Sequence, residues 1–171
     1  MKKIFLTLAL SITCAIFAQA QTEKGTLLLG GGAEFKSTSA DGASVTNYSL
    51  SPNIGYFVAE NIAVGARVDF GGSSSDGESV SNYQIAPFAR YYFLPIGSNA
   101  KLFGDASVGF AGSSAEGDKG ATVIAVQAGP AFFLNQHTAL ELAARFASIS
   151  SDGQSATQFG IRVGLQIHFG K

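Results

Sequence analysis

The sequence predicts an all-β fold, in which eight antiparallel strands close into an up-and-down barrel that spans a membrane. Three observations lead to this prediction. Apolar and polar residues alternate along most of the 171-residue chain, as they do in strands with two unlike faces. Only 13% of the residues are charged although 21 are glycine, so the chain lacks the charged surface of a typical soluble domain. Beyond the N-terminal segment, no apolar run approaches the roughly 20 residues of a transmembrane helix.

Residues 1–20 have the three parts of a cleaved signal peptide. Two lysines precede an apolar run over residues 4–17, and an Ala-Gln-Ala cleavage site follows at residues 18–20. A lipoprotein signal at Cys14 is the alternative, although the residues before this cysteine fit such a signal poorly and the apolar run continues past it. Cleavage leaves a single domain, residues 21–171, that contains no cysteine and therefore no disulfide.

Period-two alternation marks each predicted strand. It is clearest in residues 159–169, where six apolar residues alternate with Gly, Arg, Gln and His, and it is equally regular in segments 62–70 and 138–148. Five weaker matches lie near residues 26–36, 47–57, 82–93, 101–111 and 122–133. Eight strands of about ten residues have the length that crosses a bilayer when tilted.

The connections between these segments alternate in character. Four are rich in Ser, Gly and acidic residues, with an Asp-Gly or Glu-Gly pair near the middle, and lie near residues 37–46, 72–81, 112–121 and 149–156. Three are tighter and lie at residues 59–61, 95–99 and 135–137. In an even-stranded meander this alternation places all longer loops at one end and both termini at the other. The sequence therefore predicts short periplasmic turns and four longer extracellular loops.

Three prolines conflict with simple strand pairing. Pro52, Pro87 and Pro130 occupy similar places in the second, fourth and sixth segments. Proline removes a backbone donor, which normally argues against a paired strand. Because the alternation continues unshifted past Pro52 and Pro87, a one-residue bulge does not account for them.

Charged residues on the predicted strands gather on one face. They are four arginines and four carboxylates: Glu34, Arg67, Asp69, Arg90, Asp105, Glu141, Arg145 and Arg162. Every arginine of the chain is in this set, whereas the lysines lie at strand ends, in loops or at the termini. Arginine suits enclosed ion pairs because its planar fork binds a carboxylate through two hydrogen bonds. We therefore expect these eight residues to form a polar network in the lumen, with the apolar face toward lipid.

Particular pairs within this network can be predicted. Arg90 and Asp105 are expected to be cross-strand neighbours, because the turn near Gly97 brings them opposite each other. Arg67 and Asp69 are expected to join the same network, since an unpaired enclosed charge is unfavourable.

Aromatic residues on the apolar face fall toward both strand ends, as in the girdles of membrane barrels. Near the longer loops they are Phe35, Tyr48, Phe70, Tyr83, Phe110 and Phe159. Near the tighter turns they are Tyr56, Tyr91, Phe93, Phe132 and Phe169.

With these features, residues 25–171 resemble the small eight-stranded outer-membrane β-barrel family of Gram-negative bacteria, of the OmpX and OmpA-transmembrane type. The most specific part of the resemblance is that family's C-terminal assembly signal, a polar residue and a glycine followed by two spaced apolar residues. Its positions in this chain are Arg162, Gly164, Ile167 and Phe169. The chain departs from the pattern because two further residues, Gly170 and Lys171, follow the phenylalanine. The resemblance implies an outer-membrane location and recognition by the outer-membrane assembly machinery.

No residue pattern indicates an active site, and we expect no enzyme activity, no cofactor and no metal. His137 and His168 lie outside the arrangements found in barrel deacylases and proteases. His137 and Glu141 could share a strand face, but two ligands do not make a metal site. The glycines at 30–32 lie inside a predicted strand and lack the spacing and the lysine of a phosphate-binding loop.

The sequence favours a non-enzymatic integral outer-membrane protein. Such a barrel is a membrane scaffold, and its extracellular loops would serve surface binding, adhesion or envelope stability. The expected partners are the lipid bilayer and the assembly machinery, the expected state is a monomer, and a net charge of −1 gives no basic face for nucleic acid. Eight strands leave an interior filled by side chains, which argues against a wide pore. Two alternatives are a narrow low-conductance channel for small solutes and a secreted, soluble lipocalin-like carrier.

Overall fold

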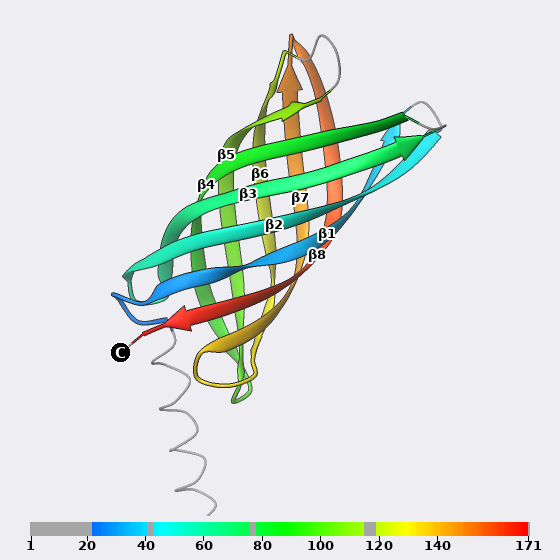
Figure 1. Ribbon diagram of the computed structural model, residues 1–171. Coiled ribbons are helices and arrows are strands. Elements are labelled where there is room, and N and C mark those ends of the chain that lie inside the picture. The colour runs from blue at the N-terminus through cyan, green and yellow to red at the C-terminus, as the bar shows by residue number, and fades with distance from the viewer. Residues whose placement is uncertain (1–21, 41–42, 76–77, 115–118, 171) are drawn as a thin grey trace, which may run out of the picture.

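Eight strands form one closed antiparallel barrel in the computed structural model, which describes residues 22–40, 43–75, 78–114 and 119–170 (Figure 1). The strands are β1 (Leu27–Ala40), β2 (Ala43–Ala59), β3 (Ile62–Ser75), β4 (Glu78–Ile96), β5 (Ala100–Ser113), β6 (Ala121–Phe133), β7 (Thr138–Ser151) and β8 (Gln154–Phe169). Each strand pairs with the next in the chain, and β8 pairs with β1, so the predicted topology is confirmed. The described residues include no helix that is long and apolar enough to span a membrane. The predicted signal peptide, residues 1–20, lies outside them.

The strands are longer than the sequence pattern indicates. β6 has 13 residues and β4 has 19, whereas a tilted strand needs only about 9–11 to cross a bilayer. The strands that flank residues 41–42, 76–77 and 152–153 continue up to these two-residue connections, so most of the three Ser- and Gly-rich segments is paired hairpin. Continued pairing satisfies the backbone N–H and C=O groups beyond the apolar band. In Figure 1 these hairpins extend away from the end that carries the C-terminus.

The two ends of the barrel differ in their connections. We call the end with the Ser- and Gly-rich hairpins the long-connection end and the other the short-turn end; both termini of the described chain lie at the short-turn end (Figure 1). At the tip of the β7–β8 hairpin, Asp152 and Gly153 both have positive φ, 51° and 80°. A two-residue turn of this kind matches the twist of the flanking strands, as the Asp-Gly pair predicts.

Side chains alternate between the lumen and the outer surface in every strand. Large apolar residues point outward: Phe110 is 75% exposed and Leu50 is 64% exposed. Both predicted sets of aromatic residues, six near the long-connection end and five near the short turns, are also exposed on this surface. The eight charged residues predicted for the lumen are buried inside. Because a lipocalin-like carrier requires the opposite arrangement, with an apolar lumen and a polar exterior, the soluble alternative is excluded.

The prolines interrupt the barrel without shifting its register. Pro52 pairs with Gly31 of β1, but the β2–β3 pairing passes from Leu50 to Asn53 and omits the residues between them. The β4–β5 pairing omits Pro87 and the β6–β7 pairing omits Pro130 in the same way. Each proline is thus paired toward the preceding strand and unpaired toward the following one. The missing N–H leaves a gap in one row of hydrogen bonds, and this explains why the alternation continues unchanged.

Glycine allows the strands to close together at two of these gaps. A Cβ atom on Gly109 would lie 2.3 Å from the backbone oxygen of Ile85, beside Pro87. A Cβ atom on Gly129 would lie 1.9 Å from the backbone oxygen of Leu142, beside Pro130. No side chain fits at these distances, so a larger residue must push the two strands apart.

We predict that Gly129→Ala destabilises the barrel and that Gly104→Ala does not. The first substitution forces a methyl group against the backbone of β7, which should lower the free energy of unfolding by about 1–3 kcal/mol. A Cβ on Gly104 would meet its nearest atom at 3.7 Å, an ordinary contact. Urea unfolding in phospholipid micelles, followed by circular dichroism, measures the difference. Equal midpoints for the two variants would show that close approach at the proline gap has no energetic weight.

Candidate functional site

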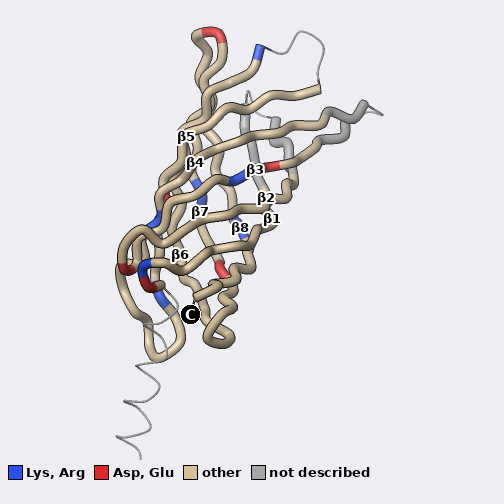
Figure 2. The backbone as a smooth tube through the Cα atoms, turned by 60° about the vertical axis from the view of Figure 1, so that its left-hand side comes forward, with Lys and Arg blue, Asp and Glu red and all other residues tan. Residues whose placement is uncertain are grey.

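The eight charged residues predicted for the lumen all lie inside the barrel, and each is at most 6% exposed. Six different strands supply them. They form two groups of ion pairs, each with two arginines and two carboxylates, so each group is neutral in itself. In Figure 2, where Lys and Arg are blue and Asp and Glu are red, most of the length of the strands carries no charged residue.

The first group is centred on Asp105 and is called the Asp105 group. Asp105 Oδ2 accepts hydrogen bonds from Arg90 Nη2 at 2.8 Å and from Arg67 Nη2 at 3.0 Å. It also accepts one from Gln127 Nε2 at 2.6 Å, and Arg90 Nη1 donates to Glu141 Oε1 at 2.7 Å. Arg90 and Asp105 stand directly opposite in the β4–β5 register, as predicted, although a register shift between Tyr92 and Leu94 contributes to this pairing beside the short turn.

The second group is centred on Glu34 and is called the Glu34 group. Arg162 Nη2 donates to Glu34 Oε2 at 2.5 Å and to Asp69 Oδ1 at 2.8 Å, while Arg145 Nη1 donates to Glu34 Oε1 at 3.4 Å. The hydroxyl of Ser51 also donates to Asp69 Oδ1. Glu34 and Arg162 are opposite each other in the β1–β8 register. Their ion pair therefore lies where the first and last strands close the barrel.

A layer of buried rings fills the lumen between the Asp105 group and the short-turn end. This aromatic layer consists of Phe57, Tyr92, Phe103, Phe133 and His168, with ring centroids 5.4–6.2 Å apart in the contacting pairs. Tyr92 donates its hydroxyl hydrogen to Glu141 Oε1 at 3.1 Å, and the guanidinium carbon of Arg90 lies 4.4 Å from the centre of the Phe103 ring. The layer thus continues directly from the Asp105 group.

The four Phe and Tyr rings of this layer were not predicted for the lumen, although the sequence contains a signal for three of them. Tyr56-Phe57, Tyr91-Tyr92-Phe93 and Phe132-Phe133 are runs of adjacent aromatic residues. Neighbours in a strand point to opposite faces, so each run must place a ring in the lumen as well as one toward lipid.

A small polar cluster lies at the short-turn end. Lys101 Nζ donates to Thr22 Oγ1 at 2.8 Å and to Asn61 Oδ1 at 3.1 Å, and Thr22 Oγ1 donates to Asn61 Oδ1 at 2.7 Å. The backbone N–H of Asn61 donates to the carbonyl of Thr22 at 2.8 Å. Thr22 is completely buried, so the chain segment before β1 is held in the barrel mouth.

The two histidines have different environments. His168 is buried within the aromatic layer, and His137 is exposed in the turn between β6 and β7. Within the described ranges, no three His, Cys, Asp or Glu side chains are grouped closely enough to hold a metal ion.

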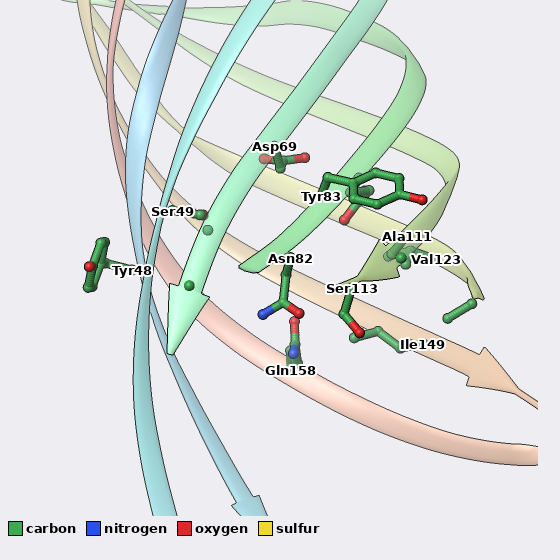
Figure 3. Close-up of a pocket in the computed structure, with 15 residues that line it drawn as sticks. Tyr48, Ser49, Asp69, Asn82, Tyr83, Ala111, Ser113, Val123, Ile149 and Gln158 are labelled. Carbon is green, nitrogen blue, oxygen red and sulfur yellow. The ribbon is translucent and has the colours of Figure 1, made fainter. Parts of the chain in front are cut away.

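A cavity of about 260 Å³ lies at the long-connection end, next to Asp69 (Figure 3). Polar residues of its lining are Ser49, Asp69, Asn82, Gln84, Ser113 and Gln158, and apolar ones include Ala111, Val123 and Ile149. Deeper in the lumen, the space among the arginines and carboxylates is only about 10 Å³, the room of one water molecule at most. The lumen is therefore open toward one end and filled below.

Comparisons with known proteins agree on the architecture. Neisserial surface protein A matches with a TM-score of 0.69 and 16% identity, over 85% of this chain and 100% of that one. OprH of Pseudomonas aeruginosa matches with a TM-score of 0.60 and 16% identity, over 85% of this chain and 99% of that one. Ail, the attachment invasion locus protein of Yersinia pestis, matches in its complex with the heparin analogue sucrose octasulfate with a TM-score of 0.59 and 14% identity, over 85% and 99% of the two chains.

The structural matches show the fold, and a match of the sequence to a family model shows the family. No curated protein matches the chain. The model for the outer membrane protein beta-barrel domain matches residues 5–169, nearly the whole length. This chain is an outer-membrane protein that belongs to the outer membrane protein beta-barrel family.

Proposed function

We propose that this protein is a closed, non-enzymatic scaffold of the outer membrane that neither conducts solutes nor catalyses a reaction, and that binds partners at the cell surface through its long connections. The observation that carries the proposal is the filling of the lumen. Three successive layers occupy it from the short-turn end: the cluster around Lys101, the aromatic layer and the two ion-pair groups.

A narrow channel is the competing function. It requires a continuous wet path past the arginines and carboxylates, and the space among them holds one water molecule at most. The aromatic layer adds a second barrier, because Phe57 and Phe103 are completely buried there and their rings fill the space. Opening a path would require breaking buried ion pairs and displacing rings together, which favours the closed state.

Surface binding is supported by the hairpins that extend past the apolar band at the long-connection end. Two structural neighbours carry names that refer to the surface or to attachment, Neisserial surface protein A and the attachment invasion locus protein. Their identities to this chain, 16% and 14%, support the fold alone. Binding by this chain is therefore our proposal, and we expect it to act as a monomer.

We also infer how the chain reaches its location. Cleavage before Gln21 would leave Thr22 as the second residue of the mature chain, and its burial against Asn61 and Lys101 supports a mature end docked in the barrel mouth. The assembly signal at Arg162, Gly164, Ile167 and Phe169 would be read by the assembly machinery. These residues belong to β8, the strand that closes the barrel on β1.

We predict that the purified protein shows no discrete current steps in planar lipid bilayers. Arg67→Ala and Arg145→Ala should remain silent as well, because the aromatic layer still closes the lumen in both. A sixteen-stranded porin reconstituted in the same way serves as the positive control. Reproducible steps from the unaltered protein would establish the channel and refute the closed scaffold.

A pair of cysteine variants tests the orientation. The only cysteine of the sequence lies within residues 1–20, so a cysteine introduced into the barrel is unique after cleavage. Asp152 lies at the β7–β8 tip and Glu60 at the short turn between β2 and β3, and both are exposed. In intact cells, a membrane-impermeant maleimide should label Asp152→Cys and leave Glu60→Cys unlabelled until the cells are lysed. Labelling of Glu60→Cys alone would invert the barrel and remove the basis for surface binding.

The energetic role of the lumen is tested by comparing a buried ion pair with an exposed one. Arg90→Met leaves Asp105 and Glu141 without their shared partner and should destabilise the barrel by about 3–5 kcal/mol. Lys119→Met breaks a pair with Asp152 whose side chains are 70% and 63% exposed, and should cost at most about 1 kcal/mol. Urea unfolding in micelles gives both values. Similar midpoints for the two variants would mean that the lumen network does not hold the barrel together.

A further inference from the structure

We propose that Gln21, the first residue after the predicted cleavage site, cyclises to pyroglutamate, and that the loss of its positive charge allows Thr22 to stay buried in the barrel mouth. The inference rests on the cleavage before Gln21 that we proposed above. It goes further, because it assigns a chemical modification to this chain and gives that modification a role in closing the short-turn end of the lumen.

A glutamine at the N-terminus carries both reacting groups on one residue. Cleavage before Gln21 frees its α-amino group, and the reaction with the side-chain amide is then intramolecular, which favours it strongly. The neutral amine nitrogen attacks the amide carbon Cδ, the bond between Cδ and Nε2 breaks, and one amine hydrogen leaves with Nε2 as ammonia. The product is a five-membered lactam, and its formation needs no oxidant, reductant or cofactor. The modified end has no α-ammonium charge.

Thr22, the next residue, is fixed inside the barrel mouth. It has no exposed surface, and its carbonyl accepts a hydrogen bond from the backbone N–H of Asn61 at 2.8 Å. Its hydroxyl donates to Asn61 Oδ1 at 2.7 Å and accepts from Lys101 Nζ at 2.8 Å. Covalent geometry keeps the α-nitrogen of Gln21 within about 4 Å of the Thr22 nitrogen in any conformation. The mature end of the chain therefore begins beside these contacts.

The mouth already contains one cation that no carboxylate neutralises by contact. Lys101 is 9% exposed, and its ammonium donates to two neutral oxygens, those of Thr22 and Asn61. Within the part of the chain that the structure describes, Lys101 forms no ion pair, and the exposed carboxylate of Glu60 acts on it only from a distance. A terminal α-ammonium would add a second, like charge near the first. The nearby cation and the removal from water both favour an uncharged end.

The charge of Lys101 affects both stages of the reaction. Before cyclisation, it favours the neutral amine of Gln21, which is the form that attacks the amide carbon. Afterwards, the lactam has no charge to be removed from water, so Thr22 can remain buried without a second cation beside Lys101. The position that disfavours the ammonium therefore favours both the nucleophile and the product.

The segment that follows Gln21 is tied to the aromatic layer. Gly25 donates its N–H to the carbonyl of Phe57 at 2.9 Å, and Phe57 donates its own N–H to the carbonyl of Thr26 at 2.9 Å. Thr26 is buried as well, at 2% exposure. These bonds continue the β1–β2 pairing toward the short-turn end and hold residues 22–26 against the strand that supplies Phe57. A neutral end completes this closure, because it leaves no charge that must reach water.

The modification is tested on the protein extracted from the outer membranes of the cells that export it, by mass spectrometry of its N-terminal tryptic peptide, residues 21–24. We expect this peptide to be lighter than its unmodified sequence by the mass of one ammonia. An isotope-labelled synthetic peptide of the same sequence, added before extraction, reports any cyclisation that handling causes. A peptide with intact Gln21 would overturn the modification and leave the cleavage proposal standing. A chain that begins at another residue would overturn both.

A matched variant tests the role of the neutral end. Gln21→Asn keeps a side-chain amide, but its lactam would be a strained four-membered ring, so this variant retains the α-ammonium. We expect the amide hydrogen of Asn61, which donates to Thr22, to exchange at least about tenfold faster in Gln21→Asn, because the docked segment opens more often. Glu23→Gln alters an exposed residue of the same segment and should exchange as the unaltered protein does. Equal exchange in all three proteins would refute the role of the neutral end.

The pH separates charge from shape in this variant. Raising the pH from about 6 to about 9 crosses the range in which an α-amino group ordinarily loses its proton, and so neutralises the end of Gln21→Asn. The chemical shift of the Thr22 γ-methyl group should then move toward its value in the unaltered protein. The cyclised chain keeps Lys101, Glu23 and Glu60 but has no α-ammonium, so its own shift over the same range is the reference. A difference between the two proteins that does not respond to pH would overturn the role of charge in docking.

Discussion

Neutralisation of charge inside a closed lumen is the constraint on which this barrel depends. Four arginines and four carboxylates are withdrawn from water, and an isolated charge in such a place would be strongly destabilising. The barrel meets this constraint locally, because the Asp105 group and the Glu34 group are each balanced. The pairs also join strands that are distant in the chain: Arg90 reaches Glu141 across 51 positions, and Glu34 reaches Arg162 across 128. The same contacts that neutralise the lumen therefore tie the wall together.

From the short-turn end to the long-connection end, the lumen changes from filled with side chains to open. The short-turn end holds the cluster around Lys101 and then the aromatic layer, in which rings contact both each other and the guanidinium of Arg90. The ion-pair groups follow, and the cavity beside Asp69 lies beyond them. The filled part and the open part of the lumen thus lie at opposite ends of one interior. Asp69 lies at the boundary, since it pairs with Arg162 in the Glu34 group and also lines the cavity.

The alternation of polar and apolar residues was sufficient to predict which side chains of the barrel wall face the lumen and which face lipid. A strict period of two separates lumen from lipid, so the eight charged residues and the two outer aromatic sets could be placed without a structure. The pairing of Arg90 with Asp105 was also predicted, but the short turn alone does not determine it. The register at the turn would set Arg90 opposite Ala106, and the register shift between Tyr92 and Leu94 moves its partner to Asp105. The Glu34–Arg162 pair and the cavity beside Asp69 were not predicted, since they depend on how β8 meets β1 and on how far the strands extend. Three of the inner rings, Phe57, Tyr92 and Phe133, were missed because each lies next to an outer aromatic ring in the sequence, whereas Phe103 lies between Leu102 and Gly104 and has no such neighbour.

The proline gaps divide the wall in a regular way. We count as hairpins the four strand pairs joined at the long-connection end, β1–β2, β3–β4, β5–β6 and β7–β8, and pairing inside each of them is unbroken. All three gaps lie between neighbouring hairpins, at β2–β3, β4–β5 and β6–β7. The two register shifts, next to Phe57 and Tyr92, fall at the same joints. The contact between β8 and β1 is the one junction between hairpins that runs without interruption. The molecule is therefore a ring of four hairpins with three interrupted junctions and one continuous junction, and the continuous one lies where the first and last strands of the chain must find each other.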